Sequence, residues 1–168
     1  MAEPSDDVEI DYPNRRKASS KVARAIVFLL LVASAALVLI ATIGGWNEIQ
    51  GARGLQLAYI VIYLIMAFFV LRWSAGVLPM AAALAIIMLI FALVSAPGWF
   101  QRDKDGFATT SIGADVLGLL CILIAIVQAV LILAALFAFR QGWGVEVERS
   151  ASERRDDSAS GSAAPAAA

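Results

Sequence analysis

Polar side chains inside long apolar segments are the residues of this sequence whose types and spacing could support chemistry. Gln56, Tyr59 and Tyr63 are spaced i, i+3, i+7, so they lie on one face of a helix. In lipid, an amide or hydroxyl either bonds a neighbouring helix or lines a cavity that holds a small ligand. We expect helix packing. The alternative is a polar path near Gln56, Tyr63 and Gln128, as in a small-molecule transporter or channel component.

A second face of this kind lies further along the chain. Gly118, Cys121 and Gln128 recur at helical spacing, and small residues let helix backbones approach closely. We expect the Gln128 amide to bond Tyr59 or Tyr63 of another helix. Because added bulk between close backbones is costly, Gly118→Leu should destabilise the protein more than Gln128→Leu. The same spacing recurs at Ala85, Met88, Ala92 and Ser95.

Residues that serve enzymes, metal sites and ion-coupled transport are scarce. The chain has no histidine and a single cysteine, Cys121, which excludes an intramolecular disulfide and CxxC metal sites. No polar residue inside the apolar segments is ionised at neutral pH, whereas coupled transporters use intramembrane charges. We therefore predict a protein that is not an enzyme, with no catalytic residue, no cofactor and no metal ligand. An enzyme would have to use carboxylates outside these segments: Asp103, Asp105 or Asp115.

Four segments without charge must position the polar residues. Apolar residues make up 61% of the chain and charged residues 16%, with a mean hydropathy of +0.80. A soluble domain is about half apolar and about a quarter charged. The uncharged segments are Ala25–Asn47, Gly54–Leu71, Trp73–Gln101 and Val116–Phe139. Each reaches or nearly reaches the roughly 20 residues that cross a bilayer core.

The sequence thus predicts an all-α membrane protein with four transmembrane helices in an antiparallel up-down bundle and disordered polar termini. The helices are expected at residues 22–44, 55–72, 78–96 and 115–139. Outer loops at 45–54 and 97–114 and a cytoplasmic turn at 73–77 join them. Pro79 suits the first turn of a helix, and Pro97 should follow the end of one. The polar tails cover 1–21 and 140–168, and the second ends in low-complexity sequence.

Tryptophan stands at or near one end of each apolar segment. Indole rings collect at membrane surfaces, where the ring stays in apolar surroundings while its N–H reaches the headgroups. We expect four membrane-interface anchors: Trp46, Trp73, Trp99 and Trp143.

Basic residues are unevenly divided between the two sides of the predicted bundle. Ten lie in or beside the tails and the 73–77 turn, and only three, Arg53, Arg102 and Lys104, in the other loops. Because Lys and Arg are retained in the cytoplasm, both termini are expected there, in a multi-pass protein of the plasma (inner) membrane. The alanine-rich helices and the Ala/Ser/Gly tail suggest a bacterial, GC-rich genome.

The first span also has features of a cleavable export signal. Arg15 and Arg16 precede an apolar stretch, and Ala33-Ser34-Ala35 fits the small-residue cleavage pattern. However, the apolar run continues past this point, so a cleaved chain would begin inside a span. We expect the first span to be retained.

Two weaker patterns involve the chain ends and the two hairpins. Segments 8–12 and 145–148 alternate apolar and acidic residues and could pair as a β-ribbon, although facing acids and only two strands make it marginal. Each hairpin also has Gly-Trp, a polar loop, Arg, Trp and Gly-Val in the same order. General rules for helix ends explain this order better than a duplication does.

Three classes of function remain. The preferred one is a small structural or partner-binding (accessory) membrane component without chemistry of its own. Its partners would be the lipid bilayer and a homo-oligomer or another membrane protein. A net charge of −1 gives no reason to expect a nucleic-acid partner. The transport component described above comes second, and an enzyme that acts on lipid comes last.

Overall fold

The computed structural model describes residues 9–49, 51–102 and 110–149. Its four long helices are each long and apolar enough to cross a membrane. Their bounds are α2 Ala18–Gly44, α3 Arg53–Leu71, α4 Val77–Gln101 and α5 Ala114–Arg140. The remaining elements are a short helix, α1 (Pro13–Arg16), and two strands, β1 (Glu9–Asp11) and β2 (Val147–Arg149). The chain is a multi-pass membrane protein.

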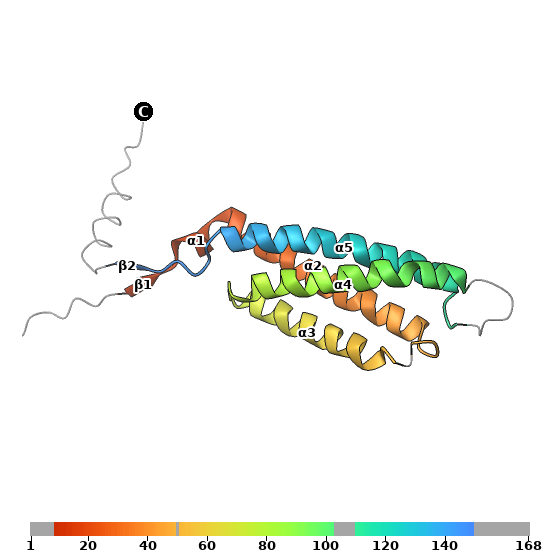
Figure 1. Cartoon of the computed structure of the whole chain (residues 1–168). Helices are drawn as coiled ribbons and strands as arrows, with labels where there is room; N and C mark the ends of the chain where they lie inside the picture. Colours follow the sequence, from red (N-terminus) through yellow and green to blue (C-terminus); the bar gives the residue numbers. More distant parts are fainter. Residues whose placement is uncertain (1–8, 50, 103–109, 150–168) are drawn as a thin grey trace, which may run out of the picture.

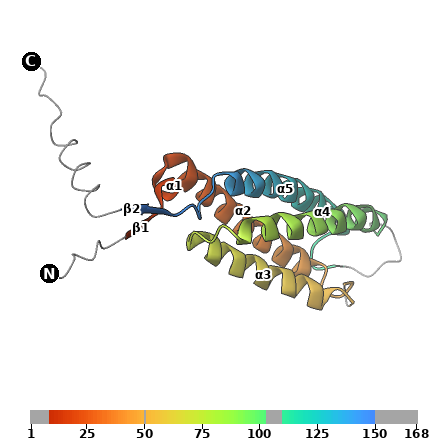
Figure 2. The ribbon, with the colours of Figure 1, turned by 60° about the vertical axis from the view of Figure 1, so that its left-hand side comes forward.

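The four long helices form an antiparallel bundle, which confirms the predicted fold class (Figure 1). We call the end at which α2 ends and α3 begins the loop end, and the opposite one the termini end. α2 packs on α3 and α5, and α4 packs closely on α5, while α3 and α4 barely touch (Figure 2). Duplicated hairpins related by symmetry would pack α3 on α4 as α2 packs on α5. The packing therefore gives a duplication no support.

The first long helix begins earlier than the sequence predicts. α2 starts at Ala18 instead of residue 22, and the backbone N–H groups of Ser20 and Lys21 donate to the carbonyl of Lys17 at 3.1 and 3.2 Å. A charged side chain limits the part of a helix that lipid can cover, but it does not break backbone hydrogen bonds. Hydropathy therefore locates the span and not the first turn of the helix.

The third long helix ends later than the sequence predicts. α4 runs through Pro97 to Gln101, where an end at residue 96 was expected. Proline lacks the N–H that would bond the carbonyl four residues earlier, so one backbone hydrogen bond is lost. Tertiary packing offsets this loss, because the Trp99 ring lies close against Gly45 of the opposite loop. The last turn thus stays helical.

The segments beside both chain ends are partly structured, although the sequence predicts disordered tails and makes a β-ribbon only marginal. β1 and β2 pair as a two-stranded antiparallel ribbon. The register places Glu9 opposite Arg149, Ile10 opposite Glu148 and Asp11 opposite Val147. In this register no acidic residue of the described strands is paired directly with another, which differs from the arrangement expected from the sequence. The rest of the predicted tails, at 1–8 and 150–168, lies outside the described residues.

Side chains beside the ribbon fasten it to the end of α5. The Asn14 amide donates to the carbonyl of Gly142 at 3.0 Å, and the Tyr12 hydroxyl donates to Glu146 at 2.9 Å. Gly142 has a φ of 59°, a left-handed conformation that glycine adopts without strain. The bond to Glu146 raises the pKa of Tyr12. The hydroxyl therefore keeps donating to a higher pH than that of an ordinary tyrosine would, and the contact is lost as the pH rises through that raised pKa.

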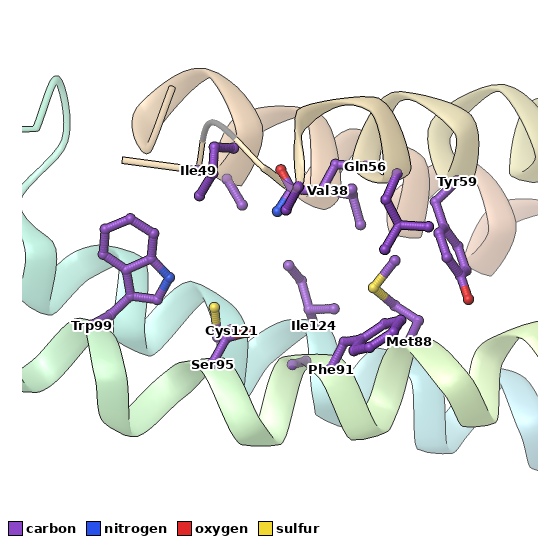
Figure 3. A pocket seen from close by; sticks show the side chains of 14 residues that line it. Val38, Ile49, Gln56, Tyr59, Met88, Phe91, Ser95, Trp99, Cys121 and Ile124 are labelled. Carbon is purple, nitrogen blue, oxygen red and sulfur yellow. The ribbon is translucent and has the colours of Figure 1, made fainter. Parts of the chain in front are cut away.

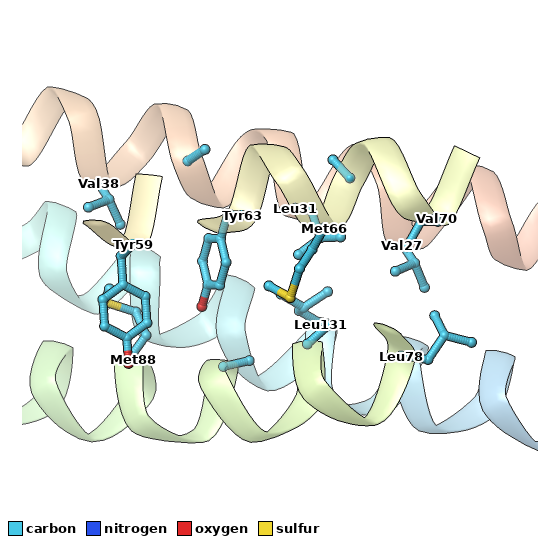
Figure 4. Close-up of a cluster of buried hydrophobic side chains, with 14 of the residues drawn as sticks. Val27, Leu31, Val38, Tyr59, Tyr63, Met66, Val70, Leu78, Met88 and Leu131 are labelled. Carbon is cyan, nitrogen blue, oxygen red and sulfur yellow. The ribbon is translucent and has the colours of Figure 1, made fainter. Parts of the chain in front are cut away.

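Apolar side chains from all four helices fill the centre of the bundle (Figure 4). Val27, Leu31, Leu78 and Leu131 are completely buried. Buried alanines are frequent on α4 and α5, and they let these two helices approach closely. The same figure shows the Tyr63 ring pointing into this core from α3.

Candidate functional site

A chain of three hydrogen bonds links α3, α5 and α2 in the middle of the bundle. The Tyr63 hydroxyl donates to Gln128 Oε1 at 2.9 Å, and Gln128 Nε2 donates to Ser34 Oγ at 3.1 Å. The Ser34 hydroxyl donates to the Leu30 carbonyl at 2.7 Å. All three polar side chains are completely buried. The expected bond between Gln128 and Tyr63 is confirmed.

A separate bond links α2 and α3 nearer the loop end. Thr42 Oγ1 lies 2.7 Å from Gln56 Oε1 and 2.6 Å from the Val38 carbonyl, and its single proton serves one of these acceptors at a time. Tyr59 packs edge-on against the Tyr63 ring, with centroids 5.7 Å apart. The three polar residues that share one face of α3 therefore lie in three different environments.

A cavity of about 240 Å³ lies between α3 and α4 in the half of the bundle nearer the loop end (Figure 3). Its floor is formed by the buried side chains of Val38 of α2 and Cys121 and Ile124 of α5. Its walls include Gln56 and Tyr59 of α3 and Met88, Ala92 and Trp99 of α4. Every lining side chain is uncharged and most are apolar. The cavity exists because α3 and α4 do not pack on each other as the other neighbouring helices do.

The mouth of the cavity opens at the side of the bundle. Leu55 of α3 and Phe91 and Ser95 of α4 line the cavity and are also exposed, so they form its rim. Ile49 and Trp99 close it toward the loop end (Figure 3). The side of a membrane-spanning bundle faces lipid or a membrane partner, so an occupant would enter from within the bilayer.

Two N–H groups are directed at the cavity. Figure 3 shows the indole nitrogen of Trp99 and the amide nitrogen of Gln56 on the sides that face it. With the Gln56 amide oriented so that its oxygen bonds Thr42, neither N–H group has an acceptor within the described part of the chain. Ser95 and Cys121 add a hydroxyl and a thiol. This lining can hold an apolar molecule with an acceptor oxygen, and among its described residues there is no carboxylate or histidine for general acid–base chemistry.

Gly118 faces a side chain and not the backbone of another helix. A Cβ at this position would lie 2.8 Å from the Phe100 ring of α4. Gly118 therefore leaves room for the aromatic ring that closes the loop end of the α4–α5 contact.

At the loop end, two tryptophans are paired with arginines. The guanidinium carbon of Arg53 lies 4.5 Å from the centre of the Trp46 ring, and that of Arg102 lies 5.5 Å from the Trp99 ring. Arg102 also forms an ion pair with Glu48, which joins the two loops. Trp46 is exposed, whereas Trp99 is half-buried. Anchoring at the membrane surface stays a prediction for both.

At the termini end, the tryptophans pack on each other inside the protein. Trp143 is completely buried, and its ring meets Trp73 edge-on with centroids 5.4 Å apart. The guanidinium carbon of Arg24 lies over the Trp73 ring, 4.2 Å from its centroid. Arg15 Nε donates to the Trp143 carbonyl at 3.0 Å. Trp143 differs from the expected anchor because its ring is packed inside the protein against Trp73. A completely buried ring has no surface for headgroups.

The sequence offers a cavity near Gln56 only as the alternative to helix packing, and it does not reveal the contribution of α4 or most of these pairings. Arginine near tryptophan at helix ends was a usable signal for the stacked pairs, and it was read only as topology. Across the described residues, no group of three or more His, Cys, Asp or Glu could hold a metal ion. The sequence matches no protein-family model, and comparisons with curated proteins and with solved structures found no match.

Proposed function

We propose that this protein is a non-enzymatic, accessory binding component of a membrane, which holds an apolar molecule or segment between α3 and α4. One observation carries the proposal: the cavity has a buried, uncharged floor and a mouth at the side of the bundle. Largely apolar concave sites with a few polar groups are the usual form of a ligand site. A lateral mouth selects an occupant that is already dissolved in the bilayer or embedded in it.

Transport along Gln56, Tyr63 and Gln128 is the weaker candidate. A path for a water-soluble solute needs polar groups that face a continuous wet space. Tyr63 and Gln128 are completely buried and bonded to each other, and Gln56 is bonded to Thr42. Opening such a path would break these bonds.

We propose further that both termini face the cytoplasm, in the plasma (inner) membrane. At the termini end, several basic side chains are exposed, which lets them contact anionic headgroups. They are Arg16, Lys17, Lys21, Arg72 and Arg140. A homo-oligomer or a membrane-protein partner would use the exposed apolar sides of the helices.

Two measurements on the full chain test the binding function. The protein is purified in mild detergent, and bound apolar molecules are extracted and identified by mass spectrometry against a detergent blank. The same preparation is reconstituted into liposomes and assayed for flux of protons, potassium and glycerol. We expect a co-purified apolar occupant and no flux above that of empty liposomes. Flux that Gln128→Leu abolishes would contradict the proposal and favour transport.

A further inference from the structure

We infer that the cavity binds a membrane phospholipid, which inserts one acyl chain between α3 and α4 and offers an ester carbonyl to the N–H groups of Trp99 and Gln56. This inference rests on the proposed binding function and names its ligand.

The apolar part of the cavity fits one hydrocarbon chain. Along α4 the lining extends from Trp99 to Met88, which corresponds to about 16 Å at 1.5 Å per residue. Met88, like the floor residue Ile124, is buried and apolar. The exposed rim residues Leu55 and Phe91 leave an apolar surface outside the mouth for the second chain of the same lipid.

The polar part of the cavity fits an ester carbonyl. The Trp99 and Gln56 N–H groups face it without an acceptor in the described structure, so a ligand of hydrocarbon alone would leave two donors unpaired. A charged headgroup inside would find no counter-charge, because no lining residue is charged. A carbonyl oxygen accepts from both donors without carrying charge.

The depth of these donors agrees with the position of lipid esters. Trp99 lies in the last turn of α4, and Gln56 lies in the first turn of α3. Both are therefore near the end of a span, where the hydrocarbon core gives way to the polar interface. The chain would point from these donors toward Met88, in the middle of the bundle.

Fluorescence quenching in detergent tests this arrangement. The full chain is delipidated and titrated with phosphatidylcholine that carries bromine atoms on one acyl chain, and tryptophan emission is recorded. We expect quenching that saturates near one lipid per chain and is largely lost in Trp99→Phe. Ser95→Leu adds bulk at the exposed rim and should weaken apparent binding by roughly tenfold or more.

The matched control is Ala83→Leu, which adds apolar bulk at an exposed position of the same helix outside the cavity. It should bind as the wild type does. Ala92→Leu, on the cavity wall, replaces Ser95→Leu in the comparison should the latter not fold. Equal quenching in the wild type and the cavity variant would overturn the inference. Extraction of a different apolar molecule in place of phospholipid would overturn the phospholipid inference but leave the proposed binding function standing. Extraction of no apolar molecule at all would overturn both the inference and the binding function.

Discussion

Two tyrosines one helical turn apart on α3 differ in what their hydroxyl groups do. The Tyr63 hydroxyl is buried and donates to Gln128, which in turn donates to Ser34. The Tyr59 hydroxyl makes no hydrogen bond to the described residues, although its ring packs on Tyr63. Spacing alone put both on one face of a helix. Only the position of α5 decides which of them has a partner.

Removing each hydroxyl should therefore have a different effect. Tyr63→Phe leaves the Gln128 carbonyl without its donor, and we expect the free energy of unfolding to fall by about 0.6 to 1.7 kcal/mol, the range of intramembrane hydrogen bonds. Tyr59→Phe is the matched control and should change it little. Denaturant titration in mild detergent, followed by circular dichroism, measures both. Equal losses would contradict the hydrogen-bond assignment.

Gly118 and Gln128 show that the sequence predicts the helix face of a residue but not the group that opposes it. The spacing correctly places Gly118 on the α5 face that meets α4, but it does not reveal the opposing group. That group is the ring of Phe100, which is itself partly exposed. An exposed ring can shift, whereas the partners of Gln128 are completely buried. The order of damage between Gly118→Leu and Gln128→Leu therefore depends on how far the Phe100 ring can shift, and it stays a prediction.

At the level of elements, the end of α3 has an uncommon residue in a common cap. Trp73 has a φ of 61°, in the left-handed region that normally favours glycine. The Ser74 N–H donates to the Phe69 carbonyl and the Trp73 N–H donates to the Val70 carbonyl, at 3.1 and 3.0 Å. These two bonds form a Schellman motif. The ring contacts with Arg24 and Trp143 offset the backbone strain.

Substitutions at Trp73 separate strain from ring packing. Alanine and glycine both remove the ring, but only glycine relieves the left-handed backbone. Trp73→Gly should therefore be more stable than Trp73→Ala by about 1 kcal/mol. The control is Ala129→Gly, at an exposed position inside α5, where the backbone is right-handed helix. There glycine should lower the stability of the protein by about 1 kcal/mol relative to alanine. Thermal unfolding in detergent compares the variants. A Trp73→Gly protein less stable than Trp73→Ala would rule out the left-handed cap.

The elements were predictable wherever the bilayer dictates them. A span needs about 20 apolar residues whatever surrounds it, so four uncharged segments sufficed to locate α2, α3, α4 and α5. Helix ends were less predictable, since the first turn of α2 is polar and α4 continues past Pro97 because Trp99 packs on Gly45. The sequence offers a cavity only as an alternative to helix packing, because the choice between them depends on how far α3 stands from α4.

At the level of the whole molecule, the two ends of the bundle are built differently. At the termini end, the β1–β2 ribbon joins the segment before α2 to the segment after α5, and Trp143 is buried against Trp73. At the loop end, the Arg102–Glu48 ion pair joins the loops while the cavity separates α3 from α4. A second apolar pocket lies between α2 and α5 at the termini end, but the cavity between α3 and α4 lies near the opposite membrane surface. A lipid would enter on that side.

The orientation of this asymmetric bundle gives the last prediction. The exposed basic residues gather at the termini end, so we expect that end in the cytoplasm and the cavity in the outer half of the membrane. In a Cys121→Ala background, single cysteines at the exposed Asn47 and Ser111 should react with an impermeant maleimide on intact cells. Cysteines at Ser5 and Ser158 should react only after permeabilisation, which is also the control for reactivity. Labelling of Ser5→Cys on intact cells would reverse the orientation, and the phospholipid would then have to come from the inner leaflet.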